Sequence, residues 1–136
     1  MVDINNLTTS PIDEGFLQKV AEIVLKGELE ISKFRNIELS IALVGQGRIR
    51  ELNKKYRGKN RTTDVLSFQY DDSGEIVICL SEIKKNAKRF NSTLEKELAK
   101  VLIHGILHLL GYNDEKSRIE TQQMEKKENY YLEKIF

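Results

Sequence analysis

The segment after Lys100 places the tightest limit on the fold, because it is predicted to be a helix without a polar side. The run is VLIHGILHLL, in which the residues other than two histidines and one glycine are apolar. A helix that is apolar nearly all round is normally buried, so other elements must cover it on several sides. Gly111 follows directly and can end this helix in the left-handed conformation that glycine tolerates.

Periodic patterns elsewhere predict both helices and strands. Helical spacing is found at 10–27, 46–57, 81–90, 92–110 and 115–136, with Ser10, Ser81 and Ser92 as the expected N-caps. Alternation predicts strands at 37–44, 64–70 and 75–80, a weaker strand at 28–34, and a four-residue hairpin loop at 71–74. These elements neither alternate strictly nor form two blocks. We therefore predict an α+β fold, with a small mixed sheet of about four strands covered by helices and one buried central helix.

Length and composition narrow the class of protein. The chain has 136 residues, 40% hydrophobic and 32% charged, which suits a single domain spanning 1–136. No apolar run reaches the ~18–20 residues of a membrane span, and the N-terminal stretch lacks the basic residues of a secretory signal. Cys79 is the single cysteine, so it has no disulfide partner within the chain, and we expect it to be buried in a strand. These features predict a cytoplasmic protein that does not span a membrane.

Positive charge is concentrated in one stretch of the sequence. Residues 48–61 include seven basic side chains and one acid, whereas the whole chain has a net charge of +1. The next stretch, 62–82, has five acids and no base. A concentrated basic segment suggests an anionic partner such as nucleic acid. A solvated helix face that happens to be basic explains the charge equally well.

The two histidines of the chain lie on the apolar helix, at His104 and His108. A separation of four residues puts both on one helix face with Cβ atoms about 5–6 Å apart, so they can bind one metal ion. Two core histidines bonded to backbone or water are the alternative. Gly111 and Asp114 complete the spacing of the metzincin zinc signature. We therefore expect zinc bound by His104, His108 and Asp114.

The position that holds the general base in His-Glu-x-x-His peptidases is occupied here by Gly105. We expect this glycine to leave open space beside the metal, where a backbone or a phosphate can approach. A metallopeptidase of the zincin type then needs another base, such as Glu115. The basic segment also argues against that alternative.

Two sequence blocks resemble the YbeY endoribonuclease family. HGILHLLGYND is similar to the family signature His-Gly-x-x-His-Leu-x-Gly-Tyr-x-His, and LNKKYRGKNRTTDVLSF, residues 52–68, resembles a second family block. The segment GEIVICL, residues 74–80, resembles a family strand, with Cys79 in place of the usual serine. The resemblance extends from about Ser40 to Asp114.

The resemblance implies a metal-dependent, single-strand-specific endoribonuclease. Its implied role is ribosomal RNA maturation at the small-subunit RNA 3′ end, together with ribosome quality control, and its implied fold is zincin-like with one zinc per chain. His104 and His108 match the first two metal ligands, and the third family histidine falls on Asp114. Aspartate can bind zinc, but its carboxylate shifts preference towards harder divalent ions, so another ion is possible.

The resemblance also gives the basic residues roles. Arg57 matches a functional family arginine and is expected to hold the scissile phosphate, so the predicted catalytic residues are Arg57, His104 and His108. Lys55, Lys59 and Arg61 are expected to contact RNA phosphates with Arg57. Tyr56 and Phe68 can stack a base, but their spacing suits the core, which is the interpretation we favour. A non-catalytic factor that binds RNA or the ribosomal small subunit, with a structural metal, is a further alternative.

Overall fold

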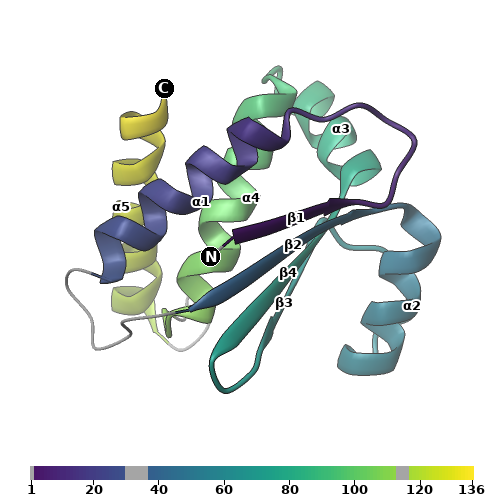
Figure 1. Cartoon of the computed structure of the whole chain (residues 1–136), viewed down its shortest axis with the longest axis horizontal. Coiled ribbons are helices and arrows are strands. Elements are labelled where there is room, and N and C mark those ends of the chain that lie inside the picture. The colour runs from purple at the N-terminus through teal and green to yellow at the C-terminus, as the bar shows by residue number, and fades with distance from the viewer. Residues whose placement is uncertain (1, 30–36, 113–116) are drawn as a thin grey trace.

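A computed structural model describes residues 2–29, 37–112 and 117–136 of the chain. The elements in that part are, in order, β1 (Val2–Asn6), α1 (Glu14–Leu29), β2 (Glu38–Val44), α2 (Gln46–Arg57), β3 (Val65–Gln69), β4 (Ser73–Cys79), α3 (Leu80–Arg89), α4 (Leu94–Leu109) and α5 (Arg118–Ile135). Figure 1 shows their arrangement around the sheet. The predicted α+β class is confirmed.

The four strands form one mixed sheet in the order β1-β2-β4-β3. β1, β2 and β4 run parallel, and β3 pairs antiparallel with β4 at one edge. Ile41 of β2 lies opposite Ile4 of β1 and Ile76 of β4, which aligns the buried side chains across the sheet. The hairpin between β3 and β4 is tighter than predicted, because Tyr70 N–H donates to the Ser73 carbonyl at 2.8 Å.

Both faces of the sheet are covered by helices. Ile41, Leu43 and Ile76 belong to the main core, which they share with α1, α3, α4 and α5. Alternate strand residues, including Val77 and Cys79, pack with Ile49 of α2 on the other face. Figure 1 shows α2 on the opposite side of the sheet from the remaining helices. Cys79 is fully buried at the end of β4, as predicted.

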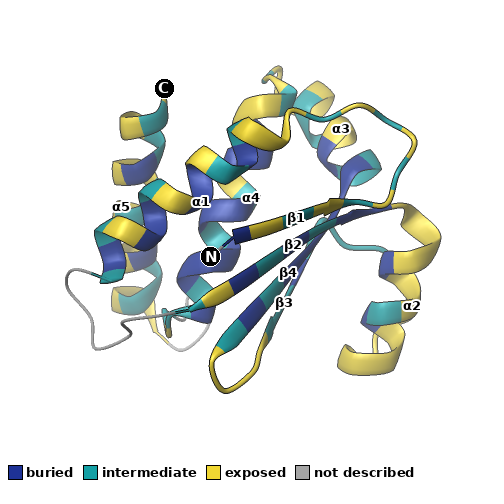
Figure 2. Ribbon diagram, in the orientation of Figure 1, coloured by how far each residue is buried: buried dark blue, intermediate teal, exposed yellow. Residues whose placement is uncertain are grey.

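α4 is the central helix that its composition predicts. Its buried side chains include Leu102, Ile103, Ile106 and Leu107, and Figure 2 shows buried residues along its length, whereas α2 is exposed over most of its surface. It packs against α1, α3, α5, β3 and β4. Across the described residues, no helix is both long and apolar enough to span a membrane.

The C-terminus of α4 is built as Gly111 predicts. Gly111 has a φ of 101°, its N–H donates to the His108 carbonyl at 3.1 Å, and Tyr112 N–H donates to the Leu107 carbonyl at 3.0 Å. These two bonds form a Schellman motif, which satisfies carbonyls that a helix end leaves without partners. The motif fixes the direction of the chain directly after His108.

The predicted N-caps were wrong. α4 begins after Thr93, whose side chain accepts from Lys96 N–H at 3.1 Å, while the Ser92 hydroxyl donates to Glu97 at 3.0 Å. α1 begins at Glu14 rather than near Ser10, and the Asp13 carboxylate accepts from Phe16 N–H at 3.0 Å. In both cases a neighbouring polar residue provides the cap.

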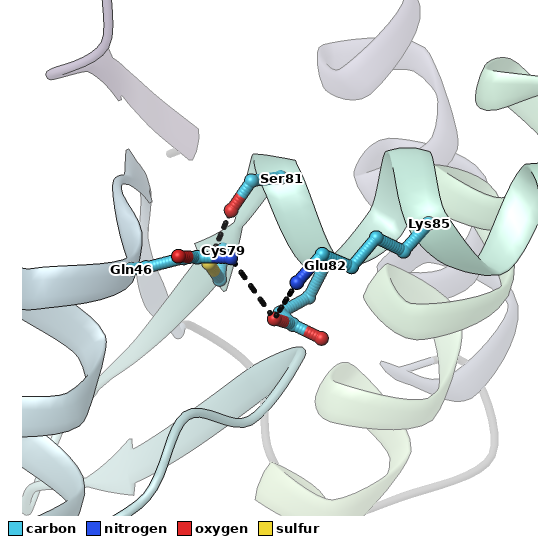
Figure 3. A network of polar contacts seen from close by, with 5 residues as sticks. All are labelled: Gln46, Cys79, Ser81, Glu82 and Lys85. Atoms are coloured by element: carbon cyan, nitrogen blue, oxygen red, sulfur yellow. Dashed lines mark hydrogen bonds and ion pairs between the residues drawn. The ribbon is translucent and has the colours of Figure 1, made fainter.

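α3 also differs from its prediction, since it begins at Leu80 directly after β4 and has no side-chain cap. Figure 3 shows the Ser81 hydroxyl beside Cys79 Sγ, at 3.3 Å, instead of capping the helix. The Glu82 carboxylate accepts from Lys85 at 3.3 Å and from Gln46 of α2 at 3.4 Å. Glu82 thus joins the starts of α2 and α3.

Two other boundaries shift. The predicted strand at 28–34 is wrong at Glu28 and Leu29, which belong to α1, and the rest of it lies outside the described residues. α5 begins at Arg118 with Ser117 as its N-cap, accepting from Glu120 N–H at 3.1 Å. β1 was not predicted.

Candidate functional site

A cavity of about 760 Å³ opens between α2, β3 and α4. Its lining includes Arg57, Lys59 and Arg61 on one side and His104 and His108 on the other. The basic segment and the histidine pair are more than forty residues apart in the sequence, and the fold brings them to one cleft. Lys55 is exposed on α2 with its ammonium group 5.2 Å from the Tyr56 ring centroid, and it does not line the cavity.

The two histidines face each other across one turn of α4. Their Nε2 atoms lie 3.0 Å apart, and their rings meet edge-on with centroids 4.5 Å apart. Both side chains are half-buried in the cleft wall rather than enclosed in the core. His104 Nδ1 lies 2.7 Å from the Glu128 carboxylate of α5. The pair therefore presents two nitrogens to one point.

These donors fit a zinc ion. Two imidazole nitrogens bound to one tetrahedral zinc lie about 3.3 Å apart, close to the distance between the two Nε2 atoms, and the carboxylate on Nδ1 is a usual support for a ligating imidazole. Asp114, the predicted third ligand, lies outside the described residues. Within residues 2–29, 37–112 and 117–136, no three His, Cys, Asp or Glu side chains form a metal-binding group.

Arg57, the last residue of α2, is fixed against β3. Its Nη2 donates to the Ser67 carbonyl at 2.7 Å and its Nη1 donates to the Tyr56 carbonyl at 3.4 Å. The guanidinium also lies over the Phe68 ring, 5.0 Å from its centroid. These bonds use two of the five N–H donors of the guanidinium, which remains exposed at the cleft. Its planar fork can therefore bind a phosphate there.

Asn53 shapes the basic loop that follows α2. Its side chain is only 3% exposed, and its Nδ2 donates to the Arg61 carbonyl at 2.9 Å. Its own carbonyl accepts from Lys59 N–H at 3.2 Å, while Gly58 turns the chain with a φ of 70°. Asn53 thus holds Lys59 and Arg61 at the wall of the cleft.

A family model described as Endoribonuclease YbeY matches residues 3–136. The chain belongs to the YbeY endoribonuclease family. The resemblance expected from the sequence blocks is confirmed.

Individual relatives agree with this assignment. A Thermotoga maritima protein named Endoribonuclease YbeY is 38% identical over 130 residues, covering 93% of this chain and 83% of its own. A Chlorobium luteolum protein of the same name is 34% identical over 139 residues, covering 99% and 98%. A solution structure of a Thermotoga maritima protein matches with a TM-score of 0.72 at 35% identity, covering 99% of this chain and 89% of that one.

In this YbeY-family chain, the expectation for Gly105 was wrong. Gly105 is buried and faces the sheet, and a Cβ built on it would lie 3.2 Å from both Ile76 Cδ1 and Ser67 Oγ. The Ser67 hydroxyl donates to the Gly105 carbonyl at 3.4 Å. The glycine thus permits close packing of α4 on β3 and β4, and it does not open space beside the histidines.

The expectation for Tyr56 was also wrong. Tyr56 is 52% exposed rather than part of the core, and its ring stands edge-on to Phe68 with centroids 5.3 Å apart. Phe68 is partly buried and packs against the smaller core cluster, as expected. The helical spacing of Tyr56 was correct, but near the end of α2 it reaches the sheet at the exposed side of Phe68, and half of the residue stays in solvent.

Glu128 and Glu28 were missed by sequence reasoning. Glu128 contacts His104 from a helix with only a weak apolar stripe, and no local pattern signals that contact. Glu28, 4% exposed, accepts from Tyr112 at 2.7 Å, from Lys127 at 3.2 Å and from Tyr131. This buried carboxylate ties α1 to α5 and to the residue after Gly111.

Charge and burial shift the pKa values in that cluster. Burial acts to raise the pKa of Glu28, but hydrogen bonds from Tyr131, Tyr112 and Lys127 outweigh it and lower the pKa. Burial and the adjacent Glu28 carboxylate raise the pKa of Tyr112 to about 12. The same causes raise the pKa of Tyr131. The carboxylate is thus held ionised and both phenols neutral.

Proposed function

We propose that this chain is a metal-dependent endoribonuclease that cleaves single-stranded RNA during ribosomal RNA maturation. The observation that carries the proposal is the single cleft in which Arg57, Lys59 and Arg61 face His104 and His108. The endoribonuclease name of the family's relatives supports this reaction class. Three cations around one cleft suit a polyanionic substrate better than a neutral one.

The basic residues bind and orient the RNA. Arg57 is fixed by its bond to the Ser67 carbonyl, so its remaining donors can hold the scissile phosphate and stabilise charge that develops on its oxygens. Lys59 and Arg61 contact neighbouring phosphates without reading sequence. A phosphate held at Arg57 then lies in the same cleft as the imidazole pair.

His104, His108 and Asp114 would hold the metal ion, with zinc as the expected ion. When bound, zinc supplies a Lewis acid that polarises a phosphoryl oxygen. A harder divalent ion is the alternative, because one of the three ligands is a carboxylate. The nucleophile is either water or the RNA 2′-hydroxyl, and the two routes leave different product ends.

The cellular setting follows from the same proposal. Small-subunit ribosomal RNA is the proposed substrate, the ribosomal small subunit the proposed partner, and the cytoplasm the proposed location. The peptidase alternative gains no support, because the position of the usual base is Gly105, packed 3.2 Å from Ile76 and Ser67. A side chain at that position would require the Ile76 and Ser67 side chains to shift.

The test is cleavage of an end-labelled single-stranded RNA by the purified chain, with zinc content measured on the same preparation. Chelator-treated protein, Arg57→Ala and folded His108→Ala are expected to lose cleavage, while Lys55→Ala, outside the cleft, retains it. A 2′,3′-cyclic phosphate on the product identifies the 2′-hydroxyl as nucleophile. Equal cleavage by Arg57→Ala or by chelated protein contradicts the proposal.

A further inference from the structure

Glu128 contacts the histidine pair from the C-terminal helix. Its Oε1 lies 2.7 Å from His104 Nδ1, and the two side chains are 26% and 32% exposed. α5 packs directly on α4, so the carboxylate approaches the imidazole from the side opposite its Nε2 atom. The contact joins residues separated by 24 positions in the sequence.

The carboxylate determines where His104 carries its proton. An ionised carboxylate can only accept a hydrogen bond, so the proton between Glu128 and His104 resides on Nδ1. In the neutral ring, Nε2 then bears a lone pair. That lone pair is directed towards His108 Nε2, 3.0 Å away, on the wall of the cleft. A proton on Nδ1 leaves the tautomer whose Nε2 can act as a ligand or as a base.

The charged residues around this contact leave the Glu128 carboxylate available to bond His104. A second cavity, of about 420 Å³, is lined by both residues and by Asp64, Glu97 and Lys100. Lys100 lies 3.4 Å from Glu97, so the cation of this cavity pairs with another carboxylate.

We propose that Glu128 is a positioning residue that fixes the ring orientation and the Nδ1–H tautomer of His104. This role makes α5 part of the site and gives the C-terminal helix a function beyond packing. In metal sites, carboxylate partners of this kind orient the ligating imidazole and raise its basicity, and their loss lowers metal affinity by 10–100-fold. The metal-binding part of the inference rests on the proposed function, whereas the tautomer part does not.

The first experiment is nitrogen-15 NMR of the metal-free protein with labelled histidine. The chain has two histidines, so the spectrum contains two imidazoles. We expect His104 to be the Nδ1–H tautomer in the wild type and a mixture of tautomers in Glu128→Ala. Glu128→Gln keeps an oxygen that can accept the same N–H and should retain the tautomer. Glu125→Gln, exposed on the same helix, is the matched control and should match the wild type.

The second experiment measures zinc affinity by competition with a chelator, with zinc alone and no RNA. Glu128→Ala is expected to bind zinc 10–100-fold more weakly, and Glu128→Gln several-fold more weakly, with Glu125→Gln unchanged. Thermal unfolding of the metal-free variants reports their folding, and Glu128→Gln gives the comparison if Glu128→Ala unfolds. Because neither readout uses RNA, a failure of the endoribonuclease proposal does not affect them.

Specific results overturn the inference. An unchanged His104 tautomer in folded Glu128→Ala shows that the carboxylate does not select it. Zinc affinity of Glu128→Ala within twofold of the wild type shows that it does not support the ligand. If the wild type binds no zinc, the tautomer measurement still decides whether Glu128 positions His104.

Discussion

Arg57 Nη2 donates a 2.7 Å hydrogen bond to the Ser67 carbonyl, which couples the end of α2 to the edge strand β3. The Ser67 hydroxyl in turn donates to the Gly105 carbonyl, one residue after His104 on α4. A short series of contacts therefore fixes the distance between the guanidinium and the imidazole pair. The position of Arg57 depends on β3 as much as on its own helix.

Replacement of Arg57 by lysine tests whether the planar fork matters beyond its charge. Lysine keeps the positive charge but cannot bond Ser67 and a phosphate from one rigid group. We expect kcat/KM for single-stranded RNA to fall about tenfold or more, a loss of at least ~1.4 kcal/mol of transition-state stabilisation. Because Arg57 is exposed, the thermal midpoint should change little. Activity equal to the wild type would show that charge alone suffices.

The salt dependence of RNA binding distinguishes cleft cations from other surface cations. Lys59 and Arg61 line the cleft, whereas Lys55 does not. Each lost phosphate contact lowers the slope of log affinity against log salt by about 0.7 for single strands. The double variant Lys59→Ala/Arg61→Ala should therefore have a slope shallower by about 1.4, and Lys55→Ala should match the wild type. Equal slopes in all three proteins contradict the assignment of the cleft.

Strong local patterns were sufficient to predict most of the fold, whereas the elements with weak patterns were missed or misplaced. α4 was predictable because apolar side chains lie on nearly all its faces. Its end was predictable because glycine tolerates the φ of 101° that Gly111 adopts. β1 was missed because Val2 and Ile4 are its only apolar residues and it lies at the sheet edge. Ser92 was the expected cap because Glu95 follows it at capping-box spacing, but Thr93 caps α4 and the Ser92 hydroxyl bonds Glu97 instead.

The site was predictable where residues lie close in sequence. His104 and His108 share a helix face by spacing alone. The approach of Arg57 to them was inferred from family resemblance, since no periodicity relates α2 to α4. Glu128 reaches His104 only through the packing of α5 on α4. Gly105 was misjudged because a residue next to a histidine in sequence lies about 100° away around the helix, here against the sheet.

Gly27→Ala should destabilise the fold although alanine is the better helix former. Gly27 lies inside α1, and a Cβ there would lie 2.5 Å from Tyr131 Oη and 2.9 Å from Cε1. Tyr131 is 1% exposed and bonded to Glu28, so it cannot move freely. Overpacking costs about 1–3 kcal/mol, and most of that range exceeds the ~1 kcal/mol gained from helix propensity.

Chemical denaturation measures this change, with Gly47→Ala of α2 as the control. A Cβ on Gly47 meets nothing within 4 Å, so that variant should be as stable as the wild type or more stable by up to ~1 kcal/mol. A Gly27→Ala protein that gains stability like Gly47→Ala would show that the Tyr131 ring relocates without cost.

Glu28 should make the fold sensitive to acid. Its pKa in the folded chain is lowered from the ordinary 4.5, so its contribution to stability is complete above pH 4.5 and is lost as the pH falls through the lowered pKa. Glu28→Gln, which keeps the size but removes the charge, should lose about 1–3 kcal/mol at pH 7. The difference in unfolding free energy between wild type and variant, measured by urea denaturation, should narrow below pH 4.5. A constant difference from pH 7 to pH 3 would contradict this role.

Tyr112 should make the fold sensitive to alkali, with the opposite direction of pH dependence. Its pKa is raised from 10.0 to about 12 by burial and by the Glu28 carboxylate, so the folded chain favours the neutral phenol. Its contribution is therefore complete below pH 10 and is lost as the pH rises from 10 towards 12.

Tyr112→Phe keeps the ring but removes the bond to Glu28, and it should cost about 1 kcal/mol at pH 7. The difference in unfolding free energy between wild type and variant should shrink above pH 10, while Tyr70→Phe, at a residue 57% exposed, should show no such trend. The bond from the Tyr112 hydroxyl to Glu28 also holds the chain that follows His108 and Gly111, so the variant should also bind zinc more weakly. If Tyr112→Phe binds zinc as tightly as the wild type, and the difference in unfolding free energy does not change with pH, the Glu28 cluster does not support the metal site.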